Sequence, residues 1–347
     1  MGLLQVPLLP LEYTGDPFEK LLGFLFAVVI LAFYIGVVNL LLMYASFSLF
    51  QGNFAAYFLS FVGVIPLWFY ASYRARRYVL ARTRWRGLRM GLEAGAWGYA
   101  WRAMGHWVLT LATLGLLWPR MTFWLEKYRT DRTFYGSVRF NQAGGWKPMF
   151  RYVLHPGIGG VSSVLIILAA LGADNIGLLW ALCLTLPWLG FGLAQYKAHT
   201  FRILTNAKSV GGVEFRAAPR PWRVFGIYLF GYGIAGIGIV ILLIAAVFIL
   251  AFMTFGVASG ADIDLVKTFE ALPRWMLTLS GVLLYFAVFL LWSALTHTFV
   301  TMPLLRHFAE TLTVVNPEAL ARIAQRPRDE FAEAEGFAEA LDVGAAI

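Results

Sequence analysis

The chain has 347 residues, of which 60% are hydrophobic, 16% aromatic and only 14% charged, and its formal net charge is +9. A soluble globular domain carries about 25% charged residues, so this chain lacks the polar surface that such a domain needs. Charge-free apolar runs recur, and a bilayer crossing takes about 20 residues. The composition therefore predicts an all-α polytopic membrane protein, and the single cysteine excludes an intrachain disulfide.

The expected spans follow a short amino-terminal segment, residues 1–20, which lacks the positive start of a cleaved signal peptide. Six charge-free runs predict six transmembrane helices in three pairs. Their approximate bounds are 21–49 and 54–73, then 152–173 and 176–196, then 224–261 and 275–305. The first two pairs are joined by QGN and ADN, which are too short to be more than the turn of a helical hairpin.

A seventh apolar run, AMGHWVLTLATLGLLWP at 103–119, is shorter and ends in a proline, which interrupts helical hydrogen bonding. The distribution of cations decides how it is interpreted. Of the 28 Lys and Arg residues, 21 lie in three segments: eight in 74–102, seven in 120–151 and six in 197–223. The short turns within the paired spans are nearly free of cations.

Basic residues in short loops stay in the cytoplasm. If 103–119 crossed fully, the first two basic segments would lie on opposite sides of the membrane. If it enters and returns, all three segments lie in the cytoplasm together with both termini. We therefore expect 103–119 to be a re-entrant or interfacial helix, with a full seventh crossing as the alternative. Residues 306–347 are expected to be a cytoplasmic acidic tail, either a weak soluble helix or a disordered arm.

A recurring pattern of a span, a proline, and a basic arm suggests an internal repeat. The arms contain TRWRGLRM (83–90), TFYGSVRF (133–140) and NAKSVGGVEF (206–215), short runs of alternating character next to a glycine. Pairing of these three runs would form a small cytoplasmic β element.

The segments TLGLLWP (113–119) and LTLPW (184–188), each followed by a basic Tyr-containing arm, a polar residue and a Gly-containing strand, resemble the YjgN family of bacterial inner-membrane proteins. The resemblance covers roughly residues 15–305. It implies a multi-pass protein of the bacterial inner membrane built around a domain of unknown function, and it implies no reaction and no catalytic residues. It also suggests a partner membrane protein, such as a membrane metallopeptidase.

The basic arms are expected to contact phosphates of anionic lipids, since a basic residue near such a surface contributes about 1 kcal/mol. A specific phosphate-bearing ligand is the second interpretation. A nucleic-acid partner is not expected, because no arm leaves room for a soluble binding domain. The candidate lipid- or phosphate-binding residues are Arg74, Arg76, Arg77, Arg82, Arg84, Arg86, Arg89, Arg129, Arg132 and Arg202.

Other motifs are interpreted as structural. GYGIAG at 231–236 matches a dinucleotide fingerprint but lies in an apolar helix instead of a strand–turn–helix unit, so its small residues are expected to serve helix packing. The five histidines lack the spacing of a zinc site, and Cys183 has apolar neighbours. We expect no metal, no cofactor and no catalytic site.

Polar residues at membrane depth are costly and often functional. Asn39, Arg102, His106 and His297 are therefore candidates for lining a path, with hydrogen bonding between helices as the simpler interpretation. Two hypotheses follow: a non-enzymatic inner-membrane protein that binds anionic lipids or a partner membrane protein through its basic arms, or a transporter or channel for a small solute or ion.

Overall fold

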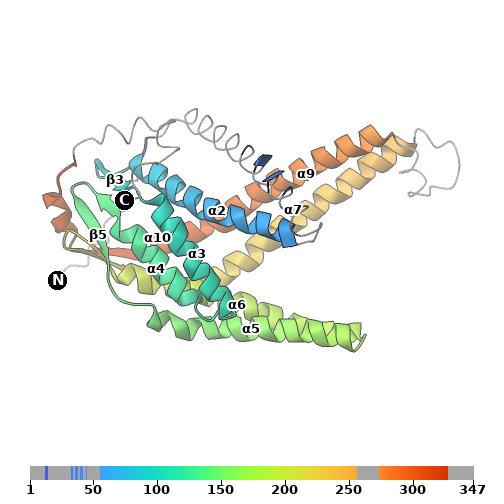
Figure 1. Cartoon of the computed structure of the whole chain (residues 1–347), viewed down its shortest axis with the longest axis horizontal. Helices are drawn as coiled ribbons and strands as arrows, with labels where there is room; N and C mark the ends of the chain where they lie inside the picture. The colour runs from blue at the N-terminus through green and yellow to red at the C-terminus, as the bar shows by residue number, and fades with distance from the viewer. Residues whose placement is uncertain are drawn as a thin grey trace. The chain divides into compact units, whose positions relative to one another are not determined.

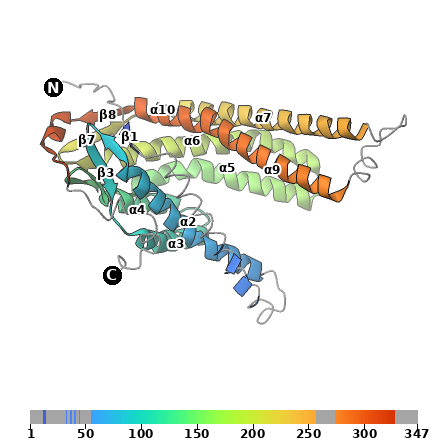
Figure 2. The ribbon, with the colours of Figure 1, turned by 90° about the horizontal axis from the view of Figure 1, so that it is seen from above.

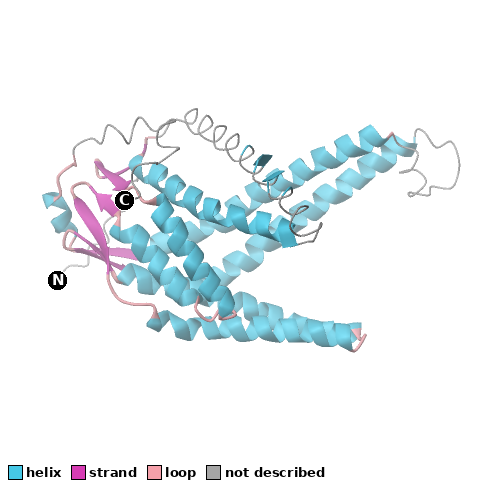
Figure 3. Ribbon diagram, viewed as in Figure 1, coloured by secondary structure: helices cyan, strands magenta, loops and turns pink. Residues whose placement is uncertain are grey.

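A computed structural model of the whole chain describes residues 12–14, a few helical positions between 33 and 44, and residues 55–255 and 273–326. Within them the chain is mostly helical and forms one eight-stranded sheet (Figures 1 and 3). Its contacts divide it into two compact units. Unit 1 holds residues 1–157, 200–217 and 313–347, and unit 2 holds 158–199 and 218–312.

The described helices are α2 (Ala55–Ala81), α3 (Ala96–Ala112), α4 (Trp118–Asp131), α5 (Lys147–Gly172), α6 (Leu182–Asn206), α7 (Pro221–Phe255), α9 (Arg274–Thr296) and α10 (Met302–Glu310). Two short 3-10 helices are η1 (Ile176–Ala181) and η3 (Pro317–Arg322), and a π-helical turn, η2 (His297–Thr301), joins α9 to α10.

The strands are β1 (Glu12–Tyr13), β2 (Thr83–Trp85), β3 (Leu88–Leu92), β4 (Thr133–Tyr135), β5 (Val138–Gln142), β6 (Lys208–Val210), β7 (Val213–Ala217) and β8 (Leu312–Val315). Their order in the sheet is their order in the sequence, and the pairs from β1 to β7 are antiparallel. The chain is mostly helical, as expected, but the fold is not all-α: the small β element that the sequence indicated is a sheet of eight strands.

Each of the three runs expected to be extended forms a hairpin instead of a single strand, because its glycine lies in a two-residue turn. In β2–β3 the turn residues Arg86 and Gly87 have φ of 51° and 79°, and in β6–β7 Gly211 and Gly212 have φ of 55° and 87°. Positive φ at both positions is the geometry that continues the twist of two antiparallel strands. A helix precedes each hairpin: α2, α4 and α6 in turn. An internal repeat stays a prediction.

Four candidate membrane spans are long and apolar enough to cross a bilayer among the residues described. They cover 147–172, 176–206, 221–249 and 274–310, and they correspond to the last four predicted spans. The first predicted span, 21–49, lies outside the described residues except for a few helical positions, and 54–73 falls almost entirely within α2. The number of six spans is not confirmed.

The pattern of span, proline and basic arm suggested that each span ends at its proline, but two of the prolines lie inside a helix. Pro66 lies inside α2 and Pro187 inside α6, so those arms continue the helix instead of leaving it. Pro119 and Pro303 stand in the first turns of α4 and α10, where the missing N–H has no helical partner to lose. Membrane helices tolerate an internal proline because neighbouring groups satisfy the freed carbonyl.

The segment 103–119 lies in a helical hairpin made by α3 and α4. The chain reverses through Leu114 and Gly115, both with positive φ. The Tyr128 hydroxyl near the end of α4 donates to the Gly95 carbonyl before α3 at 3.0 Å, so the two helices are antiparallel. In the sheet, β3 before the hairpin pairs with β4 after it.

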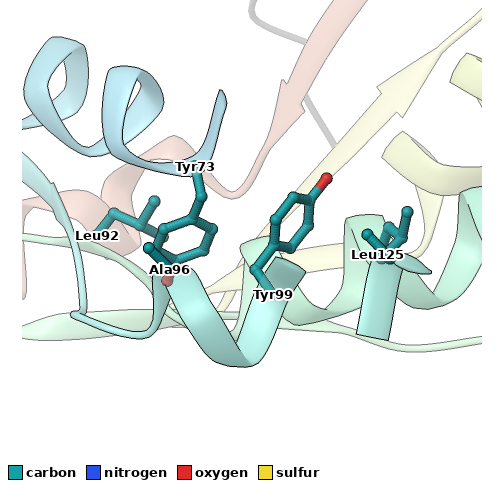
Figure 4. Packing of buried hydrophobic residues seen from close by; sticks show 6 residues of the cluster. Tyr73, Leu92, Ala96, Tyr99 and Leu125 are labelled. Atoms are coloured by element: carbon teal, nitrogen blue, oxygen red, sulfur yellow. The ribbon is translucent and has the colours of Figure 1, made fainter. Parts of the chain in front are cut away.

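The core of unit 1 has two main parts. One joins Tyr73 of α2, Ala96 and Tyr99 of α3, Leu125 of α4 and Leu92 of β3 (Figure 4). The other lies on the sheet, where Tyr135, Val210 and Val213 pack with Leu320 and Ile323. Residues 312–323, which the sequence assigned to the tail, thus form β8 and η3, because their apolar side chains cover the sheet. The acidic stretch from 327 onward lies outside the described residues.

Unit 2 contains the pair α7 with α9 and most of the pair α5 with α6 (Figure 2). A Cβ on Gly159 of α5 would lie 3.0 Å from the backbone of Leu189 of α6, and Ser163 donates to the Thr185 hydroxyl oxygen at 2.9 Å. In the other pair, Gly231 of α7 faces the carbonyl of Phe299 in η2. The packing role expected for the small residues of GYGIAG agrees with this contact.

Candidate functional site

In unit 1, three cations gather around one partly buried carboxylate, and we call this group the Glu126 cluster. Lys208 Nζ lies 2.6 Å from Glu126 Oε1, and Arg129 Nη2 lies 2.8 Å from Oε2. Arg76 Nη2 is 3.9 Å from Oε1. The cluster therefore joins α2, α4 and β6.

Local structure explains why these side chains converge. Glu126 and Arg129 are three residues apart on α4, so they share one face of the helix. Arg76 follows Tyr73 by one turn of α2, and Tyr73 is buried against α3. The strand that carries Lys208 is fixed by Gln142 of β5, whose side chain donates to the Leu204 carbonyl and whose N–H donates to Asp131 of α4 at 2.8 Å.

The electrostatics of the cluster are dominated by its cations. Burial acts to raise the pKa of Glu126, but the attraction of Lys208, Arg129 and Arg76 outweighs it and lowers the pKa to about 2. Burial lowers the pKa of the Arg76 guanidinium; Glu126 opposes that shift and Arg129 adds to it. The carboxylate is thus ionised at neutral pH, and its single negative charge faces three positive ones.

The side chains of the cluster are not sealed from solvent. Exposure is 13% for Glu126, 21% for Lys208, 29% for Arg129 and 37% for Arg76. Arg129 also lies over the Tyr99 ring at 5.6 Å. Its Nε is buried and has no hydrogen-bond partner within the described part of the chain.

Several other predicted arginines make contacts inside unit 1. Arg102 and Arg132 both lie over the ring of Tyr128, at 4.9 and 3.7 Å. Arg82 lies 3.7 Å from the ring of Tyr78. Such stacking contributes about 0.5–1 kcal/mol at exposed sites.

The remaining predicted arginines are spread over α2, the first hairpin and α6. Arg74 donates to the Tyr70 hydroxyl at 3.0 Å, and Arg77 lies three residues further along α2. Arg84 and Arg89 pair across β2 and β3. Arg86 and Arg202 are exposed, on the hairpin turn and on α6. The structure thus brings Arg76 together with Arg129, Arg102 with Arg132, and Arg84 with Arg89.

The structure describes three of the four predicted path-lining residues. Asn39 lies outside the described residues. Arg102 and His106 are one turn apart on α3 in unit 1, whereas His297 begins the π-helical turn in unit 2 and is exposed. Arg102 donates to the Gly98 carbonyl at 3.0 Å, so it is bound to its own helix.

A second basic region lies in unit 2, at one end of three packed helices. Ala194 and Ala198 of α6, Val224 of α7 and Leu304 of α10 are buried together. Exposed cations surround this contact: Lys197, Arg220, Arg223 and Arg306. We call these four residues the helix-end cations. Glu310 contacts two of them, at 3.5 Å from Arg223 and 2.9 Å from Arg306.

Sequence reasoning missed Glu126 and Lys208 as members of a site. The available signal was that Glu126 stands between the apolar residue Leu125 and the cationic residue Lys127 in a segment rich in cations. Nothing in the sequence connects it to Lys208, which lies 82 residues away. Among the residues the structure describes, no group of three or more His, Cys, Asp or Glu side chains could hold a metal ion.

Four helices long and apolar enough to cross a bilayer, together with an antiparallel sheet, indicate the class: a mostly helical protein with the features of a multi-pass membrane protein. The chain belongs to the bacterial family of unknown function DUF898, also known as YjgN, whose model matches residues 5–231. The resemblance seen in the sequence is thereby confirmed. No curated protein and no solved structure matches the chain.

Proposed function

We propose that this protein is a non-enzymatic component of the bacterial inner membrane that binds the head groups of anionic phospholipids through its basic segments. The observation that carries the proposal is the position of the helix-end cations. They lie where α6, α7 and α10 pack together, while the segments 158–172, 176–196, 224–255 and 275–305 contain no Asp, Glu, Lys or Arg.

The surroundings of these cations fit a membrane interface. Trp222 is 69% exposed beside Arg223, and its ring lies 4.3 Å from that of Phe191. Tryptophan is enriched at the level of the head groups, and basic residues there attract anionic lipids. Within the described part of unit 2, the opposite helix ends carry Asp174 and a single cation, Arg274.

The same proposal includes a cytoplasmic sheet and a re-entrant α3–α4 hairpin. It is supported by the pairing of β3 with β4 and of β5 with β6, because strands of one sheet lie on one side of a bilayer. The hairpin between β3 and β4 would then enter and return. The cytoplasmic acidic tail, which we expect to contact a partner membrane protein, lies outside the described residues.

Cysteine labelling tests this topology. In a variant without Cys183, single cysteines at the exposed hairpin positions Arg86 and Ser137 are expected to react with a membrane-permeant reagent only. A membrane-impermeant reagent added to intact spheroplasts should label neither. Labelling of one position but not the other by that reagent would show that 103–119 crosses the membrane and would refute the re-entrant hairpin.

The lipid proposal is tested by removing three of the helix-end cations. The variant R220Q/R223Q/R306Q should retain less phosphatidylglycerol after purification, because each basic residue near an anionic surface contributes about 1 kcal/mol. Lipid analysis by mass spectrometry of protein washed in uncharged detergent measures the amount per chain.

A matched control loses the same charge elsewhere. R216Q/R322Q/R326Q removes three exposed arginines, one from strand β7, one from helix η3 and one just after η3, none of them on a candidate span. Retention close to the wild-type level is expected for this control. Equal retention in both triple variants and the wild type would reject lipid binding through the helix-end cations.

A transporter or channel is the second candidate function, and the π-helical turn His297–Thr301 favours it. Isolated π turns inside longer helices occur frequently at functional sites. The turn includes a residue that the sequence suggested as path-lining, His297. Ion flux into proteoliposomes that depends on the protein and is lost in H297A would favour transport over lipid binding alone.

A further inference from the structure

We propose that Arg76, Arg129 and Lys208 form a binding site for a phosphoryl anion, with Glu126 as the internal counter-ion that holds the three cations in place. The ligand class is a phosphate group, either free phosphate or the phosphodiester of a lipid head group. The inference deepens the proposed function, because lipid phosphate is one such anion, but it concerns unit 1 and not the helix-end cations of unit 2.

The first argument is the balance of charge. Three cations contact one carboxylate, so two positive charges in the Glu126 cluster have no counter-charge. In the part of the chain that the structure describes, Glu126 is the only acidic residue within 4.0 Å of any of the three. Partly desolvated charges without a partner are unfavourable, and a bound anion would neutralise them.

The second argument is the supply of hydrogen-bond donors. Arg76 lies beyond hydrogen-bond distance from Glu126, at 3.9 Å, and donates to no other described residue. Arg129 uses Nη2 for Glu126 and leaves its buried Nε without an acceptor. A guanidinium offers its donors as a planar fork that fits two oxygens of a phosphate. Both arginines therefore have donors available for an additional anion.

The third argument is access. Arg76 is the most exposed member of the cluster and Glu126 the least, with side-chain exposures of 37% and 13%. An anion arriving from solvent would meet Arg76 first, while the carboxylate is covered by its partners. The cations come from α2, α4 and β6, so one anion bound among them would contact all three elements.

The rival explanation is that the Glu126 cluster only fastens α2, α4 and β6 together. The two explanations differ for Arg76. If the cluster is only structural, the distant contact of Arg76 with Glu126 contributes little and no anion binds. If it is a site, Arg76 contributes directly to the affinity for phosphate.

The experiment uses full-length protein in uncharged detergent at constant ionic strength, with binding measured by isothermal titration calorimetry. The first probe is inorganic phosphate. The second is dihexanoyl phosphatidylglycerol below its micelle concentration, compared with dihexanoyl phosphatidylcholine. We expect saturable binding of at least one phosphate probe and a loss of affinity of about tenfold or more in R76Q, the size expected when a charge-assisted hydrogen bond is lost.

Two variants make the result specific. R76K keeps the charge but loses the fork of donors, so its affinity should lie between wild type and R76Q. R322Q removes one exposed arginine from η3, which is neither part of the Glu126 cluster nor one of the candidate phosphate-binding residues, and it should bind like wild type. R76Q should melt close to the wild-type temperature without phosphate, since Arg129 and Lys208 still pair with Glu126.

The outcomes separate the sources of the ligand. Binding of phosphate alone identifies a free anion, and binding of the short-chain phosphatidylglycerol alone identifies a lipid head group; both support the site when R76Q weakens them. No saturable binding of either probe, or equal affinity in wild type and R76Q, overturns it. Lipid retention that depends on the helix-end cations is measured separately, so either proposal can fail while the other stands.

Discussion

Replacing Glu126 with Gln is expected to lower the free energy of unfolding by about 3 kcal/mol, the lower end of the cost of breaking a buried ion pair by removing one partner. The substitution keeps the size of the side chain and leaves Lys208, Arg129 and Arg76 facing one another without a negative charge. Because these cations stay partly hydrated, the upper end of that range is not expected. Equilibrium unfolding in mixed micelles measures the difference.

The difference in unfolding free energy between wild type and E126Q is also expected to depend on pH. The pKa of Glu126 is about 2 in the folded chain, whereas a glutamate outside the folded structure has a pKa of 4.5. The folded state therefore favours the ionised form. Its contribution is fully present above about pH 4.5 and disappears as the pH falls towards about 2. The stability gap between wild type and E126Q should therefore be widest at neutral pH and narrow steadily below about pH 4.5.

The control for Glu126 is Glu214, an exposed acid on β7. E214Q should change the free energy of unfolding by less than about 0.5 kcal/mol, as surface substitutions usually do. A similar loss in E126Q and E214Q, or a gap that does not change with pH, would contradict the central role given to Glu126.

Replacing Gly231 with Ala is expected to destabilise unit 2 by about 2–3 kcal/mol, the upper part of the range found for overpacking a close contact. A Cβ at this position would lie 2.5 Å from the Phe299 carbonyl oxygen and 2.6 Å from a methyl of Val300. The first of these is backbone and cannot rotate away. Helices α7 and α9 would have to separate at the π-helical turn.

Gly233 provides the matched control, two residues further along the same helix. A Cβ there would meet nothing within 4 Å, so G233A should gain the helix propensity of alanine, about 1 kcal/mol, without a clash. Unfolding of both variants in the same detergent gives the comparison. The close contact between α7 and η2 would be refuted if G231A proved as stable as G233A.

The apolar helices were predictable because a run of residues without charge has few alternatives to a membrane span. The predicted run 152–173 corresponds to α5, and 224–261 corresponds to α7. The ends of the helices were less predictable. Helix α6 continues to Asn206 through Lys197 and Arg202, two charges that the charge-free criterion treated as the end of the span.

The sheet could be predicted only in part. Glycine beside residues of alternating character indicated extended chain at three places, but the pairing of β5 with β6 joins Gln142 to Lys208 across two long helices. Such pairing depends on where α5 and α6 bring β6 back next to β5, and no local sequence pattern encodes that position. Helix α4 was missed for a similar reason, since its buried residues, such as Phe123 and Leu125, are interspersed with charges.

The candidate site, like the sheet, could be predicted from the sequence only in part. Arg76 and Arg129 were selected because they are cations next to apolar runs, and both belong to the Glu126 cluster. From the sequence, both arginines are predicted to contact lipid, because the sequence does not identify the single carboxylate with which they pair, that of Glu126. Charge density can be read from a sequence, whereas the direction of each side chain depends on tertiary packing.

The agreement between strand order and chain order bears on biogenesis. As the polypeptide leaves the ribosome, every new strand finds its neighbour already made, since β2 precedes β3, β3 precedes β4, and so on to β8. The long helices α5 and α6 lie between β5 and β6 in the chain, so β6 is added to the sheet only after both helices have been synthesised. Once β2 has paired with β1, assembly can thus proceed towards the carboxyl terminus with each new strand joining a strand that is already made.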